Sequence, residues 1–135
     1  PAFGTGTDPA TSFTTAEGNA TRASDIVPCL WYVHDNISID AVKSIEGADA
    51  ATGDTTRMHL MSFDLTSGST SALSNGTVLA NNSDVTNAGS EQAYLSSWTV
   101  SSAAVSSGKV ILAFFKSDSI NSDYSLSVQI KYHLT

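Results

Sequence analysis

The last thirteen residues of the chain, DYSLSVQIKYHLT (123–135), decide the fold class. Apolar and aromatic side chains take every second position in this stretch: Tyr124, Leu126, Val128, Ile130, Tyr132 and Leu134. Successive side chains of a β-strand leave opposite faces of its sheet, so a period of two is typical of a strand with one buried face. We therefore predict that the chain ends on a strand packed against the core.

Shorter strand-like segments fill most of the sequence from Ile26 onward. Between them lie clusters of Gly, Ser, Asn, Asp and Thr, the residues that form turns, and no window of helical length keeps an apolar stripe of period 3.6. Strands at this spacing predict an all-β fold, an antiparallel β-sandwich or jelly roll of about 7–8 strands. The expected strands are residues 26–35, 36–45, 57–65, 77–80, 93–100, 109–116 and 123–135.

Three of these segments carry more detailed expectations. The continuous apolar run 26–35 is typical of a strand buried on both faces, with Pro28 at its beginning or at a bulge. In 36–45 the alternation changes phase at Val42, which indicates a bulge. The third segment, 57–65, places Met58 and Leu60 on one face and His59, Met61, Phe63 and Leu65 on the other.

Residues 1–25 differ from the rest and are predicted to form an extended N-terminal arm, with residues 26–135 as a single β-sandwich domain. The segment is rich in Gly, Pro and Thr, and its only large apolar residues are Phe3 and Phe13. It cannot bury enough apolar surface to fold alone. Either it is a plain disordered terminus, or it lies on a partner with Phe3, Phe13 and Arg22 as the docking residues.

Composition excludes several classes of partner. Only 14% of the residues are charged, whereas Ser (22) and Thr (15) supply much of the polarity, and the formal net charge is −7. The six basic residues never cluster, so direct nucleic-acid binding is not expected. No apolar run approaches the roughly 20 residues that span a bilayer. A surface of hydroxyls without long charged side chains suits close packing against other copies or partners.

Metal and thiol chemistry find little support in the sequence. The three histidines, His34, His59 and His133, lack the spacing of metal ligands. Asp49 and Asp54 flank a loop that could wrap calcium, but this loop lacks the spacing and the closing Glu of an EF-hand. The sequence therefore predicts no metal or cofactor, with calcium as a minor alternative. The single cysteine, Cys29, lies in an apolar run and is expected to pack as a small hydrophobe.

No motif indicates an enzyme. The sequence has no G-x-S-x-G elbow, and most of its acids fall in turn-like segments, so no catalytic residue is assigned. Most aromatic residues are embedded among aliphatic ones and are expected to pack in the core. Tyr94 and Tyr132 have polar neighbours, so they remain the candidates for contact with a glycan.

Two stretches give the chain a resemblance to a known group of proteins. They are WYVHDNISIDAVKSIEGADAATGDTTRMHLMSFDLTSG (31–68) and SSGKVILAFFKSDSINSDYSLSVQIKYH (106–133). Their order of strands and turns, with a Gly-Asp-Thr-Thr turn, a strand ending in Phe-Asp-Leu and a Gly-Lys turn, resembles the small β-sandwich structural proteins of tailed bacteriophage virions. The resemblance covers residues 26–135 and rests on no single site.

The resemblance implies a non-enzymatic virion protein, made in the host cytoplasm without a signal peptide. It would then be a capsid decoration protein that binds the particle through its N-terminal arm and its sandwich edges. Its partners would be major capsid, connector or tail proteins, and it would form a homo-oligomer, with a trimer favoured. The alternative is a fibre or tail-tip module that binds a host surface glycan. A hydrolase on a sandwich scaffold and a filament subunit that donates a strand by β-augmentation also stay open.

Overall fold

The computed structural model describes residues 26–49, 52–65, 68, 74–89, 91–117 and 123–135. All of its regular elements are strands, which confirms the all-β prediction for the described part of the chain. The strands are β1 (Ile26–Tyr32), β2 (Ile37–Asp49), β3 (Thr55–Asp64), β4 (Ser74–Asn81), β5 (Val85–Thr86), β6 (Glu91–Ser97), β7 (Thr99–Val100), β8 (Ala104–Val105), β9 (Lys109–Ser117) and β10 (Asp123–Leu134).

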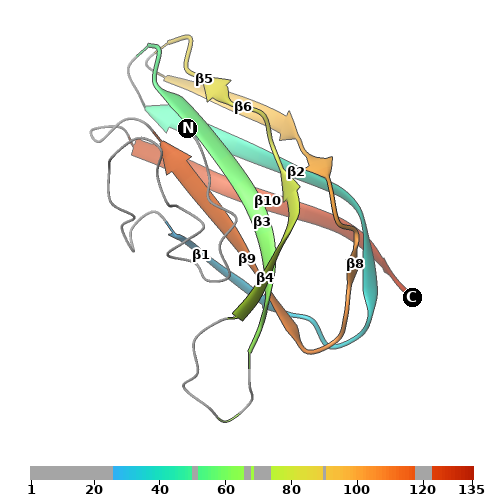
Figure 1. The fold of residues 1–135 in the computed structure, drawn as a ribbon. Helices are drawn as coiled ribbons and strands as arrows, with labels where there is room; N and C mark the ends of the chain where they lie inside the picture. The colour runs from blue at the N-terminus through green and yellow to red at the C-terminus, as the bar shows by residue number, and fades with distance from the viewer. Residues whose placement is uncertain (1–25, 50–51, 66–67, 69–73, 90, 118–122) are drawn as a thin grey trace.

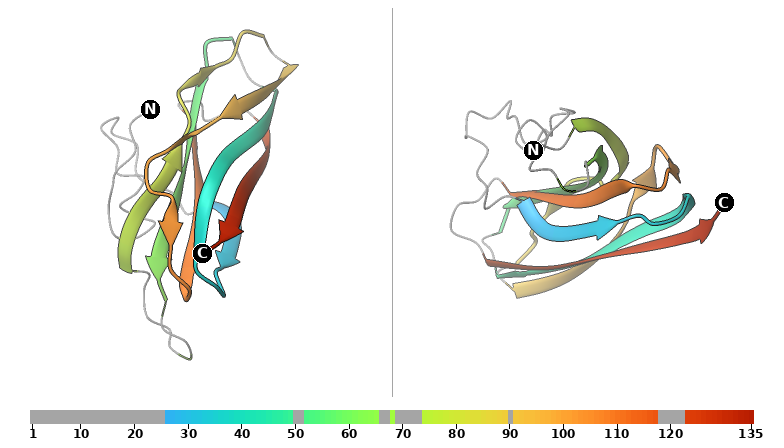
Figure 2. Two further views of the ribbon diagram at one scale, coloured as in Figure 1. Left: turned by 90° about the vertical axis from the view of Figure 1, so that its right-hand side faces the viewer. Right: turned by 90° about the horizontal axis from the view of Figure 1, so that it is seen from below.

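Two antiparallel sheets face each other as the layers of a β-sandwich (Figures 1 and 2). The six-stranded sheet has the order β1-β9-β3-β4-β7, with β5 paired to β3. The four-stranded sheet has the order β10-β2-β6, with β8 paired to β2. The chain passes between the layers several times, so strands that are neighbours in sequence often belong to different sheets.

The closing strand β10 pairs with β2 along its whole length. Their register runs from Asp123 opposite Asp49 to Leu134 opposite Ile37, and it shifts once, between Lys131 and Tyr132. At this point Asp40 of β2 has no opposite residue, so β2 carries the bulge. The bulge restores Val42 to the buried face, and the phase change in the sequence is thereby explained.

The core lies between the two sheets. Its buried members come mainly from the inward faces of β2, β3, β4 and β9 and from residues beside them. They are Val33, Ile37, Ile39, Val42, Met58, Leu60, Leu79, Ala80, Trp98, Val105, Ile111 and Ala113. Met58 and Leu60 share this face, as the alternation in 57–65 predicts.

A second apolar cluster lies on the opposite face of the six-stranded sheet. Met61 and Phe63 of β3 stand across from Leu112 and Val110 of β9, with Phe114 beside them. All five side chains are buried, so this sheet is buried on both faces although no described strand forms a further layer over it. Burial on both faces explains why residues 109–116 of β9, KVILAFFK, are almost all apolar.

Three expectations from the sequence are wrong in detail. The apolar run 26–35 forms β1 at the edge of its sheet, and Tyr32 is exposed, so this strand is not buried on both faces. Pro28 itself lies where the register of β1 is irregular, between Ile26 and Leu30, and this part of the prediction is confirmed. The second correction concerns the expected strand 36–45. Residues 46–49 extend it as part of β2, because β10 and β6 pair with them from both sides.

The third correction concerns 93–100, which is not one strand. β6 belongs to the four-stranded sheet and β7 to the six-stranded sheet, so the chain changes layers at Trp98. The buried indole of Trp98 marks this crossing. The described residues contain no helix long and apolar enough to cross a membrane.

Candidate interaction surfaces

The outer face of the four-stranded sheet is a regular exposed surface. Three neighbouring strands, β10, β2 and β6, present every second side chain on it. The exposed residues of this face are Lys43, Ile45, Ala93, Leu95, Ser97, Ser125, Ser127, Gln129 and Lys131. Seven of these nine side chains are hydroxyl, amide or apolar and only two are charged, so a partner can approach the sheet closely.

An exposed apolar pair lies in the middle of this face. Ile45 of β2 stands directly opposite Leu95 of β6, and their side chains are 45% and 64% exposed. On the other side of Ile45 its opposite residue in β10 is Ser127. A cross-strand pair of this kind offers a small apolar contact inside a flat polar surround.

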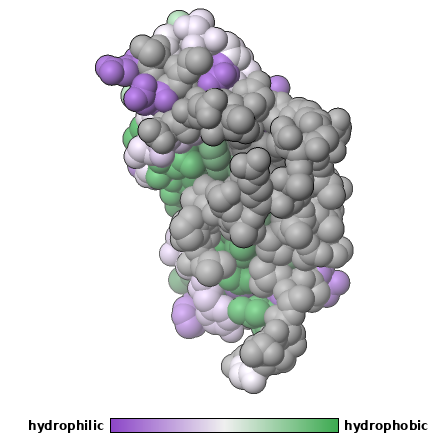
Figure 3. Space-filling view, turned by 90° about the vertical axis from the view of Figure 1, so that its left-hand side faces the viewer, coloured by the Kyte–Doolittle hydropathy of each residue, from purple (hydrophilic) through white to green (hydrophobic). Residues whose placement is uncertain are grey.

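Charged and titratable side chains are spread over the same face: Lys43 lies two positions from Ile45, Lys131 stands opposite Ala41, and further groups lie toward both ends. At one end His133 Nδ1 lies 2.9 Å from Asp40 Oδ1. At the other end Asp49 and Glu91 stand opposite each other. On a different side of the molecule, the described residues that are visible in Figure 3 show hydrophobic atoms along the middle and hydrophilic atoms toward the top and bottom.

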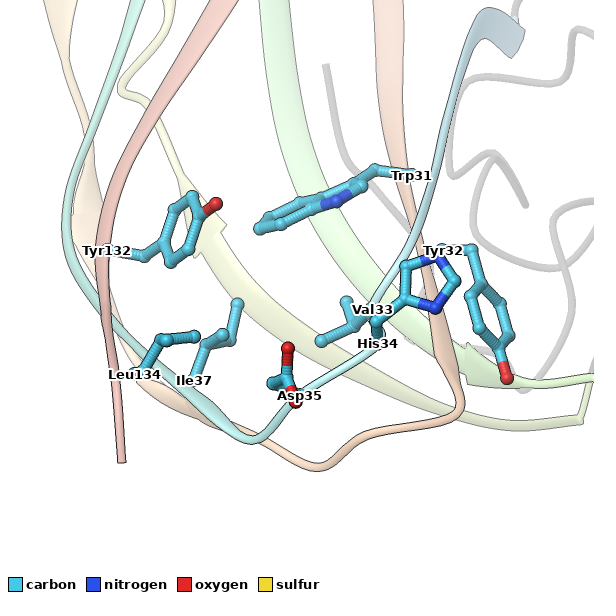
Figure 4. Close-up of a pocket in the computed structure, with 8 residues that line it drawn as sticks. All are labelled: Trp31, Tyr32, Val33, His34, Asp35, Ile37, Tyr132 and Leu134. Atoms are coloured by element: carbon cyan, nitrogen blue, oxygen red, sulfur yellow. The ribbon is translucent and has the colours of Figure 1, made fainter.

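A hollow of about 180 Å³ lies at one end of the sandwich, where β1 and β10 come together (Figure 4). The rings of Trp31 and Tyr132 meet there with centroids 4.9 Å apart and planes inclined by 46°. Val33, Ile37 and Leu134 form its apolar wall, and the carboxylate of Asp35 points toward it from below. The chain places two tilted aromatic faces and one acceptor group around the same space.

Tyr32 and His34 also line this hollow, but their rings do not lie beside those of Trp31 and Tyr132. Their rings pack edge to face, with centroids 4.9 Å apart, on the other side of the chain from Trp31 (Figure 4). Aromatic rings stack on the C–H faces of sugars through dispersion, and carboxylates accept hydrogen bonds from sugar hydroxyls. The hollow thus offers aromatic faces and a carboxylate, the kinds of group that contact sugars. From the sequence Trp31 is expected to pack in the core with most other aromatic residues, and Asp35 is not singled out.

The two tyrosines predicted to contact a glycan do not lie together. Tyr132 is in the hollow and 45% exposed, and Tyr94 is 47% exposed. They belong to the two edge strands of the four-stranded sheet, opposite Ile39 and Glu46 of β2 respectively. Seven positions of a strand separate these partners, roughly 20 Å. No common platform forms, so Tyr94 is not part of the hollow.

The predicted docking residues Phe3, Phe13 and Arg22 lie outside the described residues. The side chain of Cys29 also lies outside them. The described part of the chain therefore supplies the sheet face, the sheet edges and the hollow as surfaces for interaction.

Buried polar side chains occupy one end of the space between the sheets. Glu46 of β2 points inward, and its Oε1 accepts a hydrogen bond of 2.7 Å from Thr56 Oγ1. Burial raises the pKa of the Glu46 carboxyl, and the Thr56 bond offsets only part of that effect. Nearby on β2, Ser44 Oγ accepts a hydrogen bond of 2.8 Å from the Trp98 indole. These residues are enclosed and support the fold, so they offer no site to a ligand.

His59 is the other enclosed titratable group. Its imidazole stacks on Phe114, with ring centroids 4.9 Å apart and planes 14° from parallel. Burial, and then the charge of Arg57, lower the pKa of His59 to about 4. The ring is therefore neutral at pH 7 and packs as part of the sheet.

Metal binding finds no support among the described residues, where no group of three or more His, Cys, Asp or Glu side chains converges. Asp64, at the end of β3, instead accepts hydrogen bonds from Lys109 and, at 2.6 Å, from Asn75. These two bonds lower the pKa of Asp64. Its carboxylate stays charged and ties the ends of β3, β4 and β9 together.

Comparisons with models of protein families, with curated proteins and with solved structures find no significant match.

Proposed function

We propose that this protein is a non-enzymatic structural subunit of a larger particle. In its finer form, the proposal is a decoration protein on the capsid of a tailed bacteriophage, bound through residues 1–25 and through the sandwich. The observation that carries it is the outer face of the four-stranded sheet, where Ile45 and Leu95 are exposed in a mainly small and polar surround. The phage assignment rests on the sequence resemblance.

The size of this apolar contact favours attachment in many copies. Burying a whole Leu or Ile side chain contributes about 1.5–3 kcal/mol. Because Ile45 and Leu95 are 45% and 64% exposed, covering both contributes about 2–3 kcal/mol. One such contact is weak on the scale of specific complexes, but repetition over a symmetric particle converts weak contacts into stable attachment. Capsid, connector or tail proteins are the proposed partners.

Cosedimentation with tailed-phage particles that lack this protein tests the proposal. The full chain is compared with an Ile45→Ser/Leu95→Ser variant and with a chain that lacks residues 1–25. Leu65→Ser is the matched control, because Leu65 is exposed directly after β3, which belongs to the other sheet. We expect the full chain and the control to pellet with the particles, and both test variants to lose binding at least tenfold.

Two results contradict this proposal. One is that the full chain stays in the supernatant at every concentration tried. The other is that the double variant and the shortened chain both bind as well as the full chain, since neither proposed contact then contributes.

The hollow at Trp31 and Tyr132 favours a second candidate function, a fibre or tail-tip module that binds a host glycan. Its supporting observation is the pair of tilted rings with the Asp35 carboxylate beside them. A glycan array tests it, with Trp31→Ala as the variant and Tyr94→Ala as the control outside the hollow. A ligand that the Trp31 variant loses and the Tyr94 variant keeps supports this candidate. No bound glycan, or equal binding by the two variants, refutes it.

A further inference from the structure

The strand β10 leaves one edge of the four-stranded sheet open. Among the described residues its only partner is β2, and the sheet ends there. The inward side chains of β10 show the same opening: Leu126, Val128 and Ile130 pack on the core but are only partly buried. Val42, opposite Ile130 in β2, is fully buried. These apolar side chains of β10 are therefore less covered than those of β2 beside them.

The described residues give this edge few of the devices that protect sheet edges. Natural edge strands are often short, or carry Lys, proline, inward-pointing charges or a bulge, or are covered by a loop. β10 has twelve residues, and none between Tyr124 and Leu134 is proline. Its only Lys, Lys131, lies on the outer face, and the bulge at this point of the sheet belongs to β2. A long regular edge of this kind is a template for another strand.

We propose that β10 pairs antiparallel with β10 of a second copy, so that two four-stranded sheets become one continuous sheet across a two-fold axis. Pairing centred on Gln129 aligns the strand from Tyr124 to Leu134 with itself. The inward pairs are then Val128 with Ile130, Leu126 with Tyr132 and Tyr124 with Leu134. Each of these apolar pairs occurs twice, on the core side of the joined sheet.

The choice of a second copy follows from the self-complementarity of the strand. In this register Lys131 meets Ser127 of the other copy, so the two Lys131 charges do not face each other. Tyr132 and Leu134, which are 45% and 66% exposed, both gain apolar partners. A two-fold contact of this kind gives dimers, whereas the trimer favoured from the sequence needs a head-to-tail interface.

The proposal goes beyond the proposed function, because it concerns how copies join and not what the protein attaches to. A particle-binding assay can fail while this dimer stands, and the dimer can fail while particles still bind.

Charge substitutions on the outer face of β10 test both the pairing and its register. Ser127 and Lys131 are exposed, so these variants are expected to fold, which circular dichroism checks. Ser127→Lys places two Lys–Lys contacts across the axis, and Ser127→Glu places two Glu–Lys contacts there. The Ser127→Lys/Lys131→Glu variant restores opposite charges. Ser106→Lys, an exposed site between β8 and β9, is the matched control.

Analytical ultracentrifugation of the full chain measures the dimer dissociation constant of each variant. Cross-strand charge pairs at two symmetric positions predict a change of about two- to thirtyfold. We expect weaker dimers for Ser127→Lys, tighter dimers for Ser127→Glu and recovery in the double variant, with Ser106→Lys unchanged. A full chain that is monomeric up to high micromolar concentration overturns the proposal. So does a dimer or trimer whose dissociation constant responds equally to Ser127→Lys and to Ser106→Lys.

Discussion

Replacing Glu46 by Gln is predicted to stabilise the protein, and to do so more at higher pH. Glu46 is 4% exposed, and its Oε1 accepts the hydrogen bond of Thr56. Its Oε2 is buried with no hydrogen-bond partner among the described residues. Glutamine keeps an oxygen for the Thr56 bond and removes the buried negative charge, so the substitution separates the charge from the packing.

The direction of this pH dependence follows from the raised pKa of the Glu46 carboxyl. Between its ordinary pKa of 4.5 and the raised value, the folded state holds a proton that the unfolded state has lost. The stability that Glu46 contributes is therefore fully present below pH 4.5 and is lost as the pH rises through the raised pKa. An unpaired buried polar group costs about 1–3 kcal/mol, and more when it is charged. The amide nitrogen of glutamine takes the unpaired place of Oε2, so the substitution removes only the extra cost of the charge. We expect Glu46→Gln to gain about 1 kcal/mol at pH 7.5 and nothing below pH 4.5.

Urea unfolding followed by the fluorescence of Trp31 and Trp98, at intervals from pH 4 to pH 8, measures the difference. Glu91→Gln is the control, because Glu91 is exposed at the start of β6, and it is expected to change the free energy of unfolding by less than about 0.5 kcal/mol. The reasoning is refuted if Glu46→Gln is less stable than the wild type at pH 7.5. It is refuted equally if the two proteins differ by the same amount at every pH.

Three further substitutions test the interior. The pKa of His59 is lowered from 6.5 to about 4, so the stability that the neutral ring contributes is present above pH 6.5 and is lost as the pH falls toward 4. The free energy of unfolding should therefore fall by about 3 kcal/mol between those pH values, and urea titrations of the His59→Leu variant should lack this change. Trp98→Phe removes the donor to Ser44 and should cost about 1–2 kcal/mol, part of which Ser44→Ala restores in the double variant; a full additive loss argues against that bond. Asn82→Ala leaves the Met58 N–H without the Oδ1 acceptor 2.7 Å away and should lower the free energy of unfolding by about 1–3 kcal/mol, so an unchanged melting curve contradicts this role.

Local sequence patterns predicted several features of the sheets correctly. The alternation in 123–135 determines β10 because only one register buries its apolar side chains. The phase change at Val42 indicated the bulge in β2, and Pro28 indicated the irregularity in β1, since proline cannot donate a ladder hydrogen bond. Each of these signals is contained within a few neighbouring residues.

Pairing between distant segments could not be predicted from the sequence. Residues 46–49 have a turn-like composition, yet strands on both sides hold them in β2, so tertiary context overrides propensity. Ile45 and Leu95 are fifty positions apart, and only the register of β2 with β6 shows that they form one exposed pair. The hollow likewise depends on the meeting of Trp31 and Tyr132 across the two sheets.

The stoichiometry of this chain in purified particles tests the proposed structural role most directly. Tailed particles from the biological source of this chain are banded by density, and quantitative mass spectrometry compares peptides of this chain with those of the major shell protein. A decoration protein should be present at a fixed ratio, in many copies per particle, that survives repeated banding. Peptides found only in the unbanded soluble fraction contradict the proposed role.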